Sequence, residues 1–408
     1  MKALVLAGGL PQITLIKQLK ERNVITILAD GNATPIARPY ADKFYQVNIF
    51  DIEAIKNIAV QENVDFLITC CADQVLLVVA QVSEMLGLPC YINYETAQRV
   101  SDKREMKRIF WENDIPTSRY VELQTLEWDK IKNLNYPLVV KPVDAYSSKG
   151  VRKVWNEKEL EIAFEEASKI SRASGVIVEE FCEGDEISVD VYVENGKAHI
   201  LCVSNSEKIN DIDKFIIFRG RYPAATSAEI MEQIQTVAQQ IADAFELKNS
   251  PMLIQMINNG KNVSVLEFCA RTGGNMKYLL IKYVCEFDVI KAVIDLTMGE
   301  TPSVNIAPPK HKYVVNDFIY CNPGVFDRLE GFDKLQEEGI LTEYHCLRPH
   351  KTVVRGVNSS SDRIAGFSVV ADSLEEFNRK HRMVVEKTKV IDIEGNDIMR
   401  HDLLPDLV

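Results

Sequence analysis

The 408-residue sequence has no long hydrophobic run and no CxxC cysteine motif. Its longest apolar runs, such as residues 75–80, are far shorter than the roughly 18 residues that a membrane-spanning helix needs. The first apolar run stops at Gly8 and is too short for a signal peptide, so it predicts a β-strand. The nine cysteines are scattered, without a CxxC pair or a nearby histidine cluster. This usage argues against a zinc site and predicts reduced, buried thiols in a cytoplasmic protein.

An excess of basic charge is also absent. The chain has 47 Lys and Arg against 59 Asp and Glu, which gives a net charge of −12. Nucleic-acid binding depends on clustered basic residues that face phosphates, so we expect no nucleic-acid partner. The hydrophobic content of 46% is typical of a packed globular protein, and the length predicts two to four structural units.

Apolar runs and amphipathic segments alternate over residues 1–95, which predicts a parallel sheet with helices on both faces. The strands are expected at residues 2–7, 24–29, 66–69 and 90–92, and the helices at 12–22, 52–62 and 75–86. Residues 96–175 read as a mixed α and β segment. From residue 176 the pattern becomes antiparallel, with an Asn195-Gly196 hairpin turn, and residues 279–298 read as one helix. Residues 301–408 read as a proline-rich linker followed by an α+β unit.

The most informative motif is VSVLEFCARTGG at residues 263–274, in which a strand-like run carries Glu267 and is followed by Arg271. A carboxylate in apolar surroundings needs a metal or a cation to remain charged. Glu267 could therefore hold Mg²⁺ against the phosphates of a nucleotide, and Arg271 could face an anion that forms during a reaction. A structural Glu–Arg ion pair is the alternative interpretation.

Two lysines upstream are candidates for contact with phosphate. Lys103 begins a predicted helix, and Lys141 ends the apolar strand PLVVKP at residues 137–142. The loop that follows Lys141 contains Ser147, Ser148, Lys149 and Gly150, and its hydroxyl and backbone N–H groups could surround a triphosphate. Surface lysines and an ordinary hairpin loop are the alternatives.

A second strand, at residues 176–181, ends on Glu179 and Glu180, and Cys182 and Glu186 follow. The free backbone N–H and C=O groups of a strand edge can form hydrogen bonds with an adenine, and Glu186 could bind ribose hydroxyls. Gln255 interrupts another apolar strand twelve residues before Glu267. The two residues share a face if an odd number of residues connects the strands, and they lie on opposite faces if the connection is a two-residue turn.

Taken in order, these motifs resemble the ATP-grasp superfamily. The resemblance rests on SDK at 101–103, PLVVKP at 137–142, SSKG at 147–150, VEEFCEGDEISVD at 178–190 and LEFCARTGG at 266–274. It implies an α/β and α+β fold with a preATP-grasp domain (1–95), two ATP-grasp subdomains (96–175 and 176–300) and a C-terminal subdomain (301–408). RGVNSSSDRIAGF at residues 355–367 is similar to the C-terminal subdomain of L-amino-acid ligases.

The resemblance also implies roles for the candidate residues. Lys103 and Lys141 would contact ATP phosphates, and the loop with Ser147, Ser148, Lys149 and Gly150 would cover them. Glu179 and the backbone of Glu180 and Cys182 would hold adenine, and Glu186 would hold ribose. Glu267 and Gln255 would face Mg²⁺ or Mn²⁺, while Arg271 and Lys141 would act in phosphoryl transfer. Two departures weaken the metal site, since Gln255 stands where the superfamily usually has an acid and Cys269 where it often has Asn.

The expected activity is ATP-dependent ligation of a carboxylate to an amine through an acyl phosphate. Arg219 and Arg221 are candidates for holding the substrate carboxylate, with an exposed basic loop as the alternative. A bicarbonate-activating enzyme and a non-catalytic ATP-binding module are the other functional hypotheses. The expected partners are small molecules and a second copy of the chain, because a homodimer is the commonest assembly of soluble enzymes.

Overall fold

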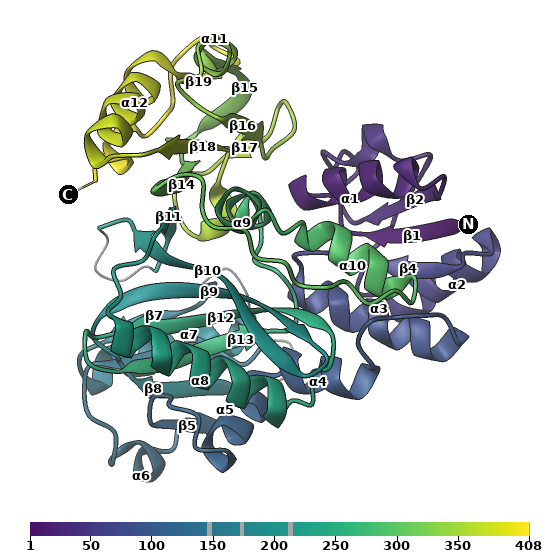
Figure 1. The fold of residues 1–408 in the computed structure, drawn as a ribbon. Coiled ribbons are helices and arrows are strands. Elements are labelled where there is room, and N and C mark those ends of the chain that lie inside the picture. The colour runs from purple at the N-terminus through teal and green to yellow at the C-terminus, as the bar shows by residue number, and fades with distance from the viewer. Residues whose placement is uncertain (145–148, 172–174, 211–214, 408) are drawn as a thin grey trace.

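The computed structural model describes residues 1–144, 149–171, 175–210 and 215–407. The N-terminal unit is built on a parallel four-stranded sheet with the order β3-β2-β1-β4 (Figure 1). Its strands are β1 (Lys2–Leu6), β2 (Ile25–Asp30), β3 (Lys43–Gln46) and β4 (Phe66–Ile68). This confirms the predicted parallel sheet, although β3 was not predicted. Residues 90–92, expected to form a strand, form none.

Helices cover both faces of this sheet, as predicted, but one of them comes from far along the chain. The helices are α1 (Leu10–Glu21), α2 (Ile52–Glu62), α3 (Asp73–Leu86) and α10 (Val289–Thr297). One face packs into the same core as α1 and α10, and the other into the core of α2 and α3. Figure 1 shows α10 beside α1 and β4. The face that β1 presents to α1 is therefore covered partly by residues almost 300 positions away.

A second, antiparallel sheet with the order β5-β8-β6-β7 follows the N-terminal unit. Its strands are β5 (Tyr120–Leu123), β6 (Leu138–Pro142), β7 (Arg152–Val154) and β8 (Val176–Glu180). The helices of this region are α4 (Tyr94–Ser101), α5 (Lys103–Glu112), α6 (Trp128–Ile131) and α7 (Glu157–Ile170). Helix α7 and one face of this small sheet share a compact core, so the opposite face remains for the site described below.

The largest element is an eight-stranded sheet with the order β13-β12-β9-β10-β11-β14-β18-β16. Its strands are β9 (Asp185–Glu194), β10 (Lys197–Lys208), β11 (Ile217–Tyr222), β12 (Ser250–Asn258), β13 (Val263–Cys269), β14 (Tyr313–Ile319), β16 (Glu343–Cys346) and β18 (Ala365–Ala371). The predicted hairpin joins β9 to β10, and Asn195 and Gly196 both have positive φ angles, as a two-residue turn of this kind requires.

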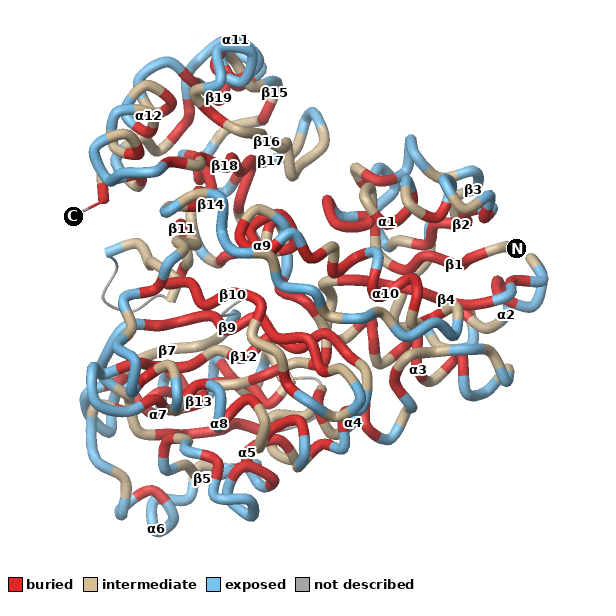
Figure 2. The backbone as a smooth tube through the Cα atoms, in the orientation of Figure 1, coloured by how far each residue is buried: buried red, intermediate tan, exposed pale blue. Residues whose placement is uncertain are grey.

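The two faces of this sheet differ at its β13 end. Alternate residues of β9 and β12 pack against α8 (Ala228–Ala244), so one face forms an apolar core. The residues between them point to the other face and include Glu186 on β9 and Gln255 on β12. Figure 2 shows the largely buried course of β9 and β10 through the middle of the molecule. Polar side chains thus gather on a face that is otherwise well shielded.

The sheet continues without a break across the boundary predicted at residue 300, because β11 pairs with β14. Residues 299–312 form neither helix nor strand, which agrees with the proline-rich linker. A three-stranded sheet, β17-β15-β19, completes the C-terminal region. Its elements are β15 (Gly324–Glu330), β17 (Val353–Val354), β19 (Lys389–Asp392), α11 (Phe332–Glu337) and α12 (Leu374–Lys387). Short 3-10 turns lie at Arg38–Tyr40, Ser360–Asp362 and His401–Leu403.

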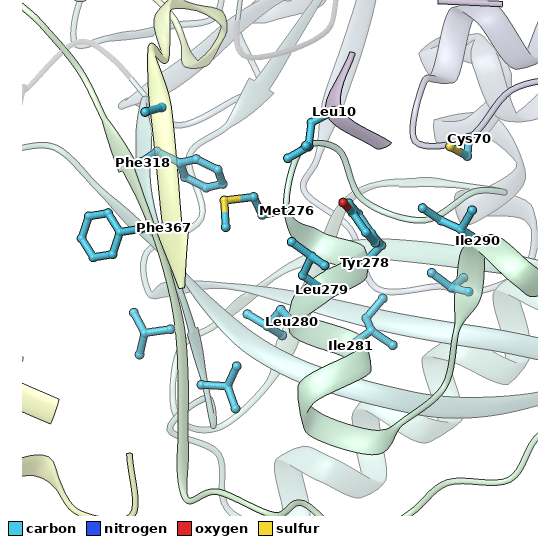
Figure 3. Close-up of a cluster of buried hydrophobic side chains, with 14 of the residues drawn as sticks. Leu10, Cys70, Met276, Tyr278, Leu279, Leu280, Ile281, Ile290, Phe318 and Phe367 are labelled. Atoms are coloured by element: carbon cyan, nitrogen blue, oxygen red, sulfur yellow. The ribbon is translucent and has the colours of Figure 1, made fainter. Parts of the chain in front are cut away.

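Residues 279–298 form two helices instead of the single helix predicted. Helix α9 (Lys277–Cys285) ends at Glu286, which adopts a left-handed conformation, and the Asp288 side chain caps α10. Figure 3 shows Met276, just before α9, directed at Phe318 of β14. A side chain at Gly366 would lie 2.6 Å from the Met276 sulfur, so glycine makes room for this contact. In the described part of the chain, no helix is long and apolar enough to cross a membrane.

Candidate functional site

The strand pair β12–β13 places Gln255 directly opposite Glu267. The loop between the strands, residues 259–262, has an even number of residues, which alone would put the two side chains on opposite faces. A β-bulge at Leu266 inserts one extra residue, since Met256 pairs with Val265 while Gln255 pairs with Glu267. The bulge therefore produces the shared face that the sequence left open.

Glu267 lies close to Lys103, the first residue of α5. The Lys103 Nζ atom is 3.2 Å from Glu267 Oε2, and the two side chains are 16% and 37% exposed. Burial alone would lower the pKa of Lys103, but the neighbouring Glu267 carboxylate raises it above its ordinary value. Lys103 is thus held as a cation beside a carboxylate that still faces solvent.

Lys141 ends β6 and forms an ion pair with Glu179 on β8, with 2.6 Å between Nζ and Oε1. The other oxygen of Glu179 is 2.7 Å from Nζ of Lys107, and all three side chains are less than 10% exposed. Burial would raise the pKa of Glu179, but the two lysines lower it to about 2. Glu179 is therefore an ionised carboxylate shared by two buried cations.

Glu186 on β9 has partners at both carboxylate oxygens. Its Oε1 accepts a hydrogen bond of 3.0 Å from the Gln255 side-chain amide, and its Oε2 is 2.6 Å from Nζ of Lys208. The hydrogen bond uses the amide nitrogen of Gln255, so the amide oxygen remains an acceptor. Glu186 thereby fixes which end of Gln255 is presented to Glu267.

Backbone contacts connect these groups into one region. The Lys103 backbone N–H donates to the carbonyl of Val143, two residues after Lys141. The Thr117 hydroxyl donates to the carbonyl of Val265, two residues before Glu267, and itself accepts from Lys107. The segments that carry Lys103, Lys141 and Glu267 are therefore joined to one another by these contacts.

Arg271 lies two residues beyond the end of β13 and pairs with Asp73 at the start of α3. The Arg271 Nε atom donates to Asp73 Oδ1 over 2.5 Å, and Nη2 donates to Oδ2. The Nη1 atom donates to the Thr272 carbonyl. Burial alone would lower the pKa of Arg271, but Asp73 raises it above its ordinary value. The predicted anion-facing group is thus a permanent cation, held by an acid from the N-terminal unit.

Two of the predicted binding residues have other surroundings in the structure. Arg219 on β11 is fully buried, with its Nε atom 2.6 Å from Asp317 on β14, and it also contacts His381. This environment makes Arg219 part of a buried ion-pair cluster and does not support a role in holding a substrate. Arg221 is partly exposed and pairs with Glu207 at 2.7 Å. Neither arginine is an exposed, unpaired basic group.

The predicted phosphate loop is described only in part. Ser147 and Ser148 lie outside the described residues, while Lys149 is exposed. Gly150 has a φ of +73°, and a side chain there would lie 2.7 Å from Ile170 and 3.0 Å from Pro142, so this position requires glycine. Gly150 thus lets the chain turn back tightly against the end of β6.

The remaining adenine candidates have mixed surroundings. The Glu180 carboxylate pairs with Arg119 and accepts from the Asn135 backbone, and the Glu180 backbone N–H donates to the Arg119 carbonyl. Cys182 contacts the Ser264 hydroxyl at 3.6 Å, which places it beside β13.

The donor set fits a magnesium ion that is held mainly by phosphates and water. Glu267 offers a carboxylate and Gln255 an amide oxygen on the same face, and Mg²⁺ takes one or two such protein ligands in nucleotide sites. Within the described residues, no three His, Cys, Asp or Glu side chains gather as a preformed metal cage. Cys269 shares the Glu267 face, but burial raises the pKa of its thiol, so it is a poor metal ligand.

Three charged residues of this region were not identified from the sequence: Asp73, Lys107 and Lys208. Asp73 follows the carboxyl end of β4, where ligand-binding loops of parallel sheets gather, and this position was a usable signal. Lys107 lies one helical turn after Lys103, beside the apolar face of α5. Lys208, at the end of β10, has no comparable signal in its sequence neighbourhood.

Residues 134–278 match the ATP-grasp domain family. Over 328 residues, the chain is 25% identical to the formate-dependent phosphoribosylglycinamide formyltransferase of Sulfurisphaera tokodaii, covering 77% of this chain and 80% of that protein. It is 22% identical over 292 residues (69% of this chain) to the carbamoyl phosphate synthase large chain of Clostridium acetobutylicum, but spans only 27% of that protein's length.

The fold is similar to that of the L-amino acid ligase from Bacillus licheniformis, with a TM-score of 0.81 and 19% identity. The match covers 96% of this chain and 99% of the ligase. The predicted fold class is thereby confirmed. The chain contains an ATP-grasp domain at residues 134–278, within a fold similar to that of this ligase.

Proposed function

We propose that the protein is an ATP-dependent carboxylate–amine ligase that acts on amino-acid-like substrates. The observation that supports this most directly is the position of Glu267 and Arg271 at the end of one strand, with Lys103 beside the first and Asp73 beside the second. A metal-binding carboxylate next to a fixed guanidinium is the arrangement that phosphorylation of a carboxylate requires.

The lysines would neutralise the phosphates of ATP. Lys103 is held beside Glu267 and Lys141 beside Glu179, so both cations lie at positions where a nucleotide phosphate can replace or join the present carboxylate partner. Glu267 and Gln255 would hold Mg²⁺, which withdraws charge from the phosphate oxygens when bound. Glu179 lies on β8, next to the Lys141 strand, and Glu186 lies on β9, next to the Gln255 strand. We assign Glu179 to the adenine and Glu186 to the ribose.

Arg271 would bind the substrate carboxylate and then its phosphorylated form. Asp73 and the Thr272 carbonyl accept from three of its five N–H groups, which leaves two for an anion. A carboxylate oxygen attacks the terminal phosphorus of ATP, and ADP leaves. The amine nitrogen then attacks the acyl carbon, phosphate leaves, and the nitrogen loses a proton to give the amide.

A bicarbonate-activating enzyme is the second candidate. The same strand end could hold bicarbonate against Arg271, and the similarity to a carbamoyl phosphate synthase large chain favours this alternative. A non-catalytic nucleotide-binding module is the third, because Gln255 and Cys269 replace groups that the superfamily commonly uses for metal binding. The three candidates share the nucleotide site and differ in what accepts the phosphoryl group.

The test is phosphate release from Mg-ATP across a panel of amino acids, alone and in pairs, with bicarbonate as a separate arm. Release that requires a carboxylate and an amine together supports the ligase, whereas release that requires bicarbonate rejects it in favour of the second candidate. Nucleotide binding without release in any arm supports the third. Glu267→Gln and Arg271→Ala should abolish the release, while Glu112→Gln, on the exposed face of α5, should leave it unchanged.

A further inference from the structure

Asp73 is the first residue of α3 and belongs to the N-terminal unit. Arg271 lies two residues after β13, which is an edge strand of the eight-stranded sheet. The two residues are 198 positions apart in the sequence. Their contact is therefore a product of domain docking, and no local pattern around Arg271 indicates it.

The contact is bidentate and partly enclosed. Both carboxylate oxygens of Asp73 accept from Arg271, one from Nε and one from Nη2, and the side chains are 28% and 13% exposed. Such parallel hydrogen bonds fix the plane of a guanidinium, because the carboxylate and the guanidinium must be coplanar. Asp73 occupies the Nε–Nη2 edge and the Thr272 carbonyl accepts from Nη1, so one N–H group of Nη1 and one of Nη2 remain for an anion.

Asp73 is also kept ionised for this role. Burial would raise its pKa, but Arg271 and, more weakly, Lys103 hold the pKa below its ordinary value. Its place in the first turn of α3 adds the favourable interaction of a carboxylate with a helix N-terminus.

Neighbouring contacts reinforce the same interface. The hydroxyl of Tyr91, which follows α3, donates to the carbonyl of Ala270 over 3.0 Å. The Cys71 carbonyl, two residues before Asp73, lies near Gly274, where an added side chain would come within 3.7 Å of it. The segment around Arg271 is thus fastened to the N-terminal unit on both sides, which keeps the position of Asp73 well defined.

We propose that Asp73 is a positioning residue that orients the Arg271 guanidinium toward the substrate anion and makes the reaction depend on docking of the N-terminal unit. The inference rests on the proposed function, in which Arg271 contacts the carboxylate and its phosphorylated form. In this proposal Asp73 acts through Arg271 and contacts neither group itself.

The test compares Asp73→Asn and Asp73→Ala with Glu84→Gln, a carboxylate change on the exposed surface of the same helix. We expect kcat to fall about 10- to 100-fold in both Asp73 variants, the range seen when a group that orients a functional residue is removed. The Kd for ATP, measured by calorimetry without the acceptor, should stay close to the wild-type value, and the thermal midpoint should fall only modestly, because Asp73 is 28% exposed. Glu84→Gln should resemble the wild type in all three measurements.

A double-mutant cycle with Arg271→Lys provides the second readout. Lysine keeps the charge but not the bidentate fork. The loss of kcat caused by Asp73→Ala should therefore be much smaller in the Arg271→Lys background than in the wild type. Additive losses would overturn the inference, as would unchanged kcat in the Asp73 variants or a parallel fall in ATP affinity and thermal midpoint.

Turnover by the wild-type protein distinguishes a failure of the inference about Asp73 from a failure of the proposed function. If the wild-type chain releases phosphate but the Asp73 variants match it, the inference alone is wrong. If the wild-type chain binds ATP but shows no turnover with any carboxylate, amine or bicarbonate, the proposed function is wrong and the inference fails with it.

Discussion

The Nζ atom of Lys103 lies 3.2 Å from Oε2 of Glu267, although Lys103 begins helix α5 and Glu267 lies on the edge strand β13. The pair closes a site in which each of the predicted phosphate-binding lysines has a carboxylate partner. Bound Mg-ATP would change these pairings, because its phosphates are stronger partners for lysine and its metal is a stronger partner for Glu267. The paired charges keep the site compact until the nucleotide arrives.

Replacing Lys141 with Ala should weaken ATP binding at least about tenfold, since a charge-assisted contact to phosphate contributes about 1.5–3 kcal/mol. Adenosine, which has no phosphates, should bind the variant and the wild type equally. Glu179 keeps Lys107 as a partner in this variant, so the fold should persist. Calorimetric titration with ATP and with adenosine measures the two affinities. Lys158→Ala, on the exposed face of α7, is the control. Equal ATP affinity in all three proteins would show that Lys141 does not contribute to ATP binding.

The ionised state of Glu179 predicts a specific pH dependence of stability. Its pKa falls from the ordinary 4.5 to about 2 in the folded protein, so its contribution is complete above pH 4.5 and is lost as the pH falls toward 2. Glu179→Gln leaves two buried lysines without their counter-ion and should cost about 3–5 kcal/mol at pH 7.

Urea unfolding from pH 7 down to pH 3 would measure this dependence. The difference between the wild type and Glu179→Gln should be constant down to about pH 4.5 and should shrink below it. The exposed Glu161→Gln variant should show no such change. A difference that stays constant down to pH 3 would contradict the assignment.

Gln255→Glu tests the metal site without relying on turnover. The change replaces the hydrogen bond to Glu186 with a like-charge contact and places two carboxylates opposite each other, so the thermal midpoint should fall in the presence of a chelator. Mg²⁺ with a non-hydrolysable nucleotide should raise the midpoint more in the variant than in the wild type, because the ion neutralises the added charge. An equal rise in both proteins would mean that position 255 does not face the metal.

The buried pair between Arg219 and Asp317 should matter for stability and not for binding. Asp317→Asn leaves the fully buried guanidinium with only the more distant Glu207 carboxylate as a charge partner and should reduce the free energy of unfolding by about 3 kcal/mol. Denaturant unfolding measures the loss, with the exposed Asp372→Asn as the control. The ATP affinity of folded Asp317→Asn should equal that of the wild type, and a selective loss of substrate affinity would restore Arg219 as a binding residue.

The sequence was sufficient for elements whose pattern is local. The helix predicted at residues 52–62 forms with the predicted bounds, and the strand-like runs that contain Lys141 and Glu267 form strands. The motif residues Lys103, Lys141 and Glu267 also meet in one region, because each is placed at an end or edge of its element. Local hydrophobic periodicity and strand ends carry this information.

Relationships across long separations could not be predicted in the same way. The bulge at Leu266 decides whether Gln255 faces Glu267, yet no glycine or other signal marks it in the sequence. Asp73 and Lys208 became relevant only after distant segments packed together. The single helix expected at residues 279–298 is broken at Glu286, which adopts a left-handed conformation that is rare for a charged residue.

The position of α10 also bears on how the chain reaches its native state. Helix α10 contributes to the core on one face of the first parallel sheet, although the strands of that sheet are complete by residue 68. During synthesis, residues 1–95 would emerge from the ribosome with an apolar surface that stays open until residue 297 has been made. The N-terminal unit is thus a late-maturing part of the molecule despite being made first, and a fragment that ends near residue 95 should aggregate unless a peptide that contains α10 is supplied.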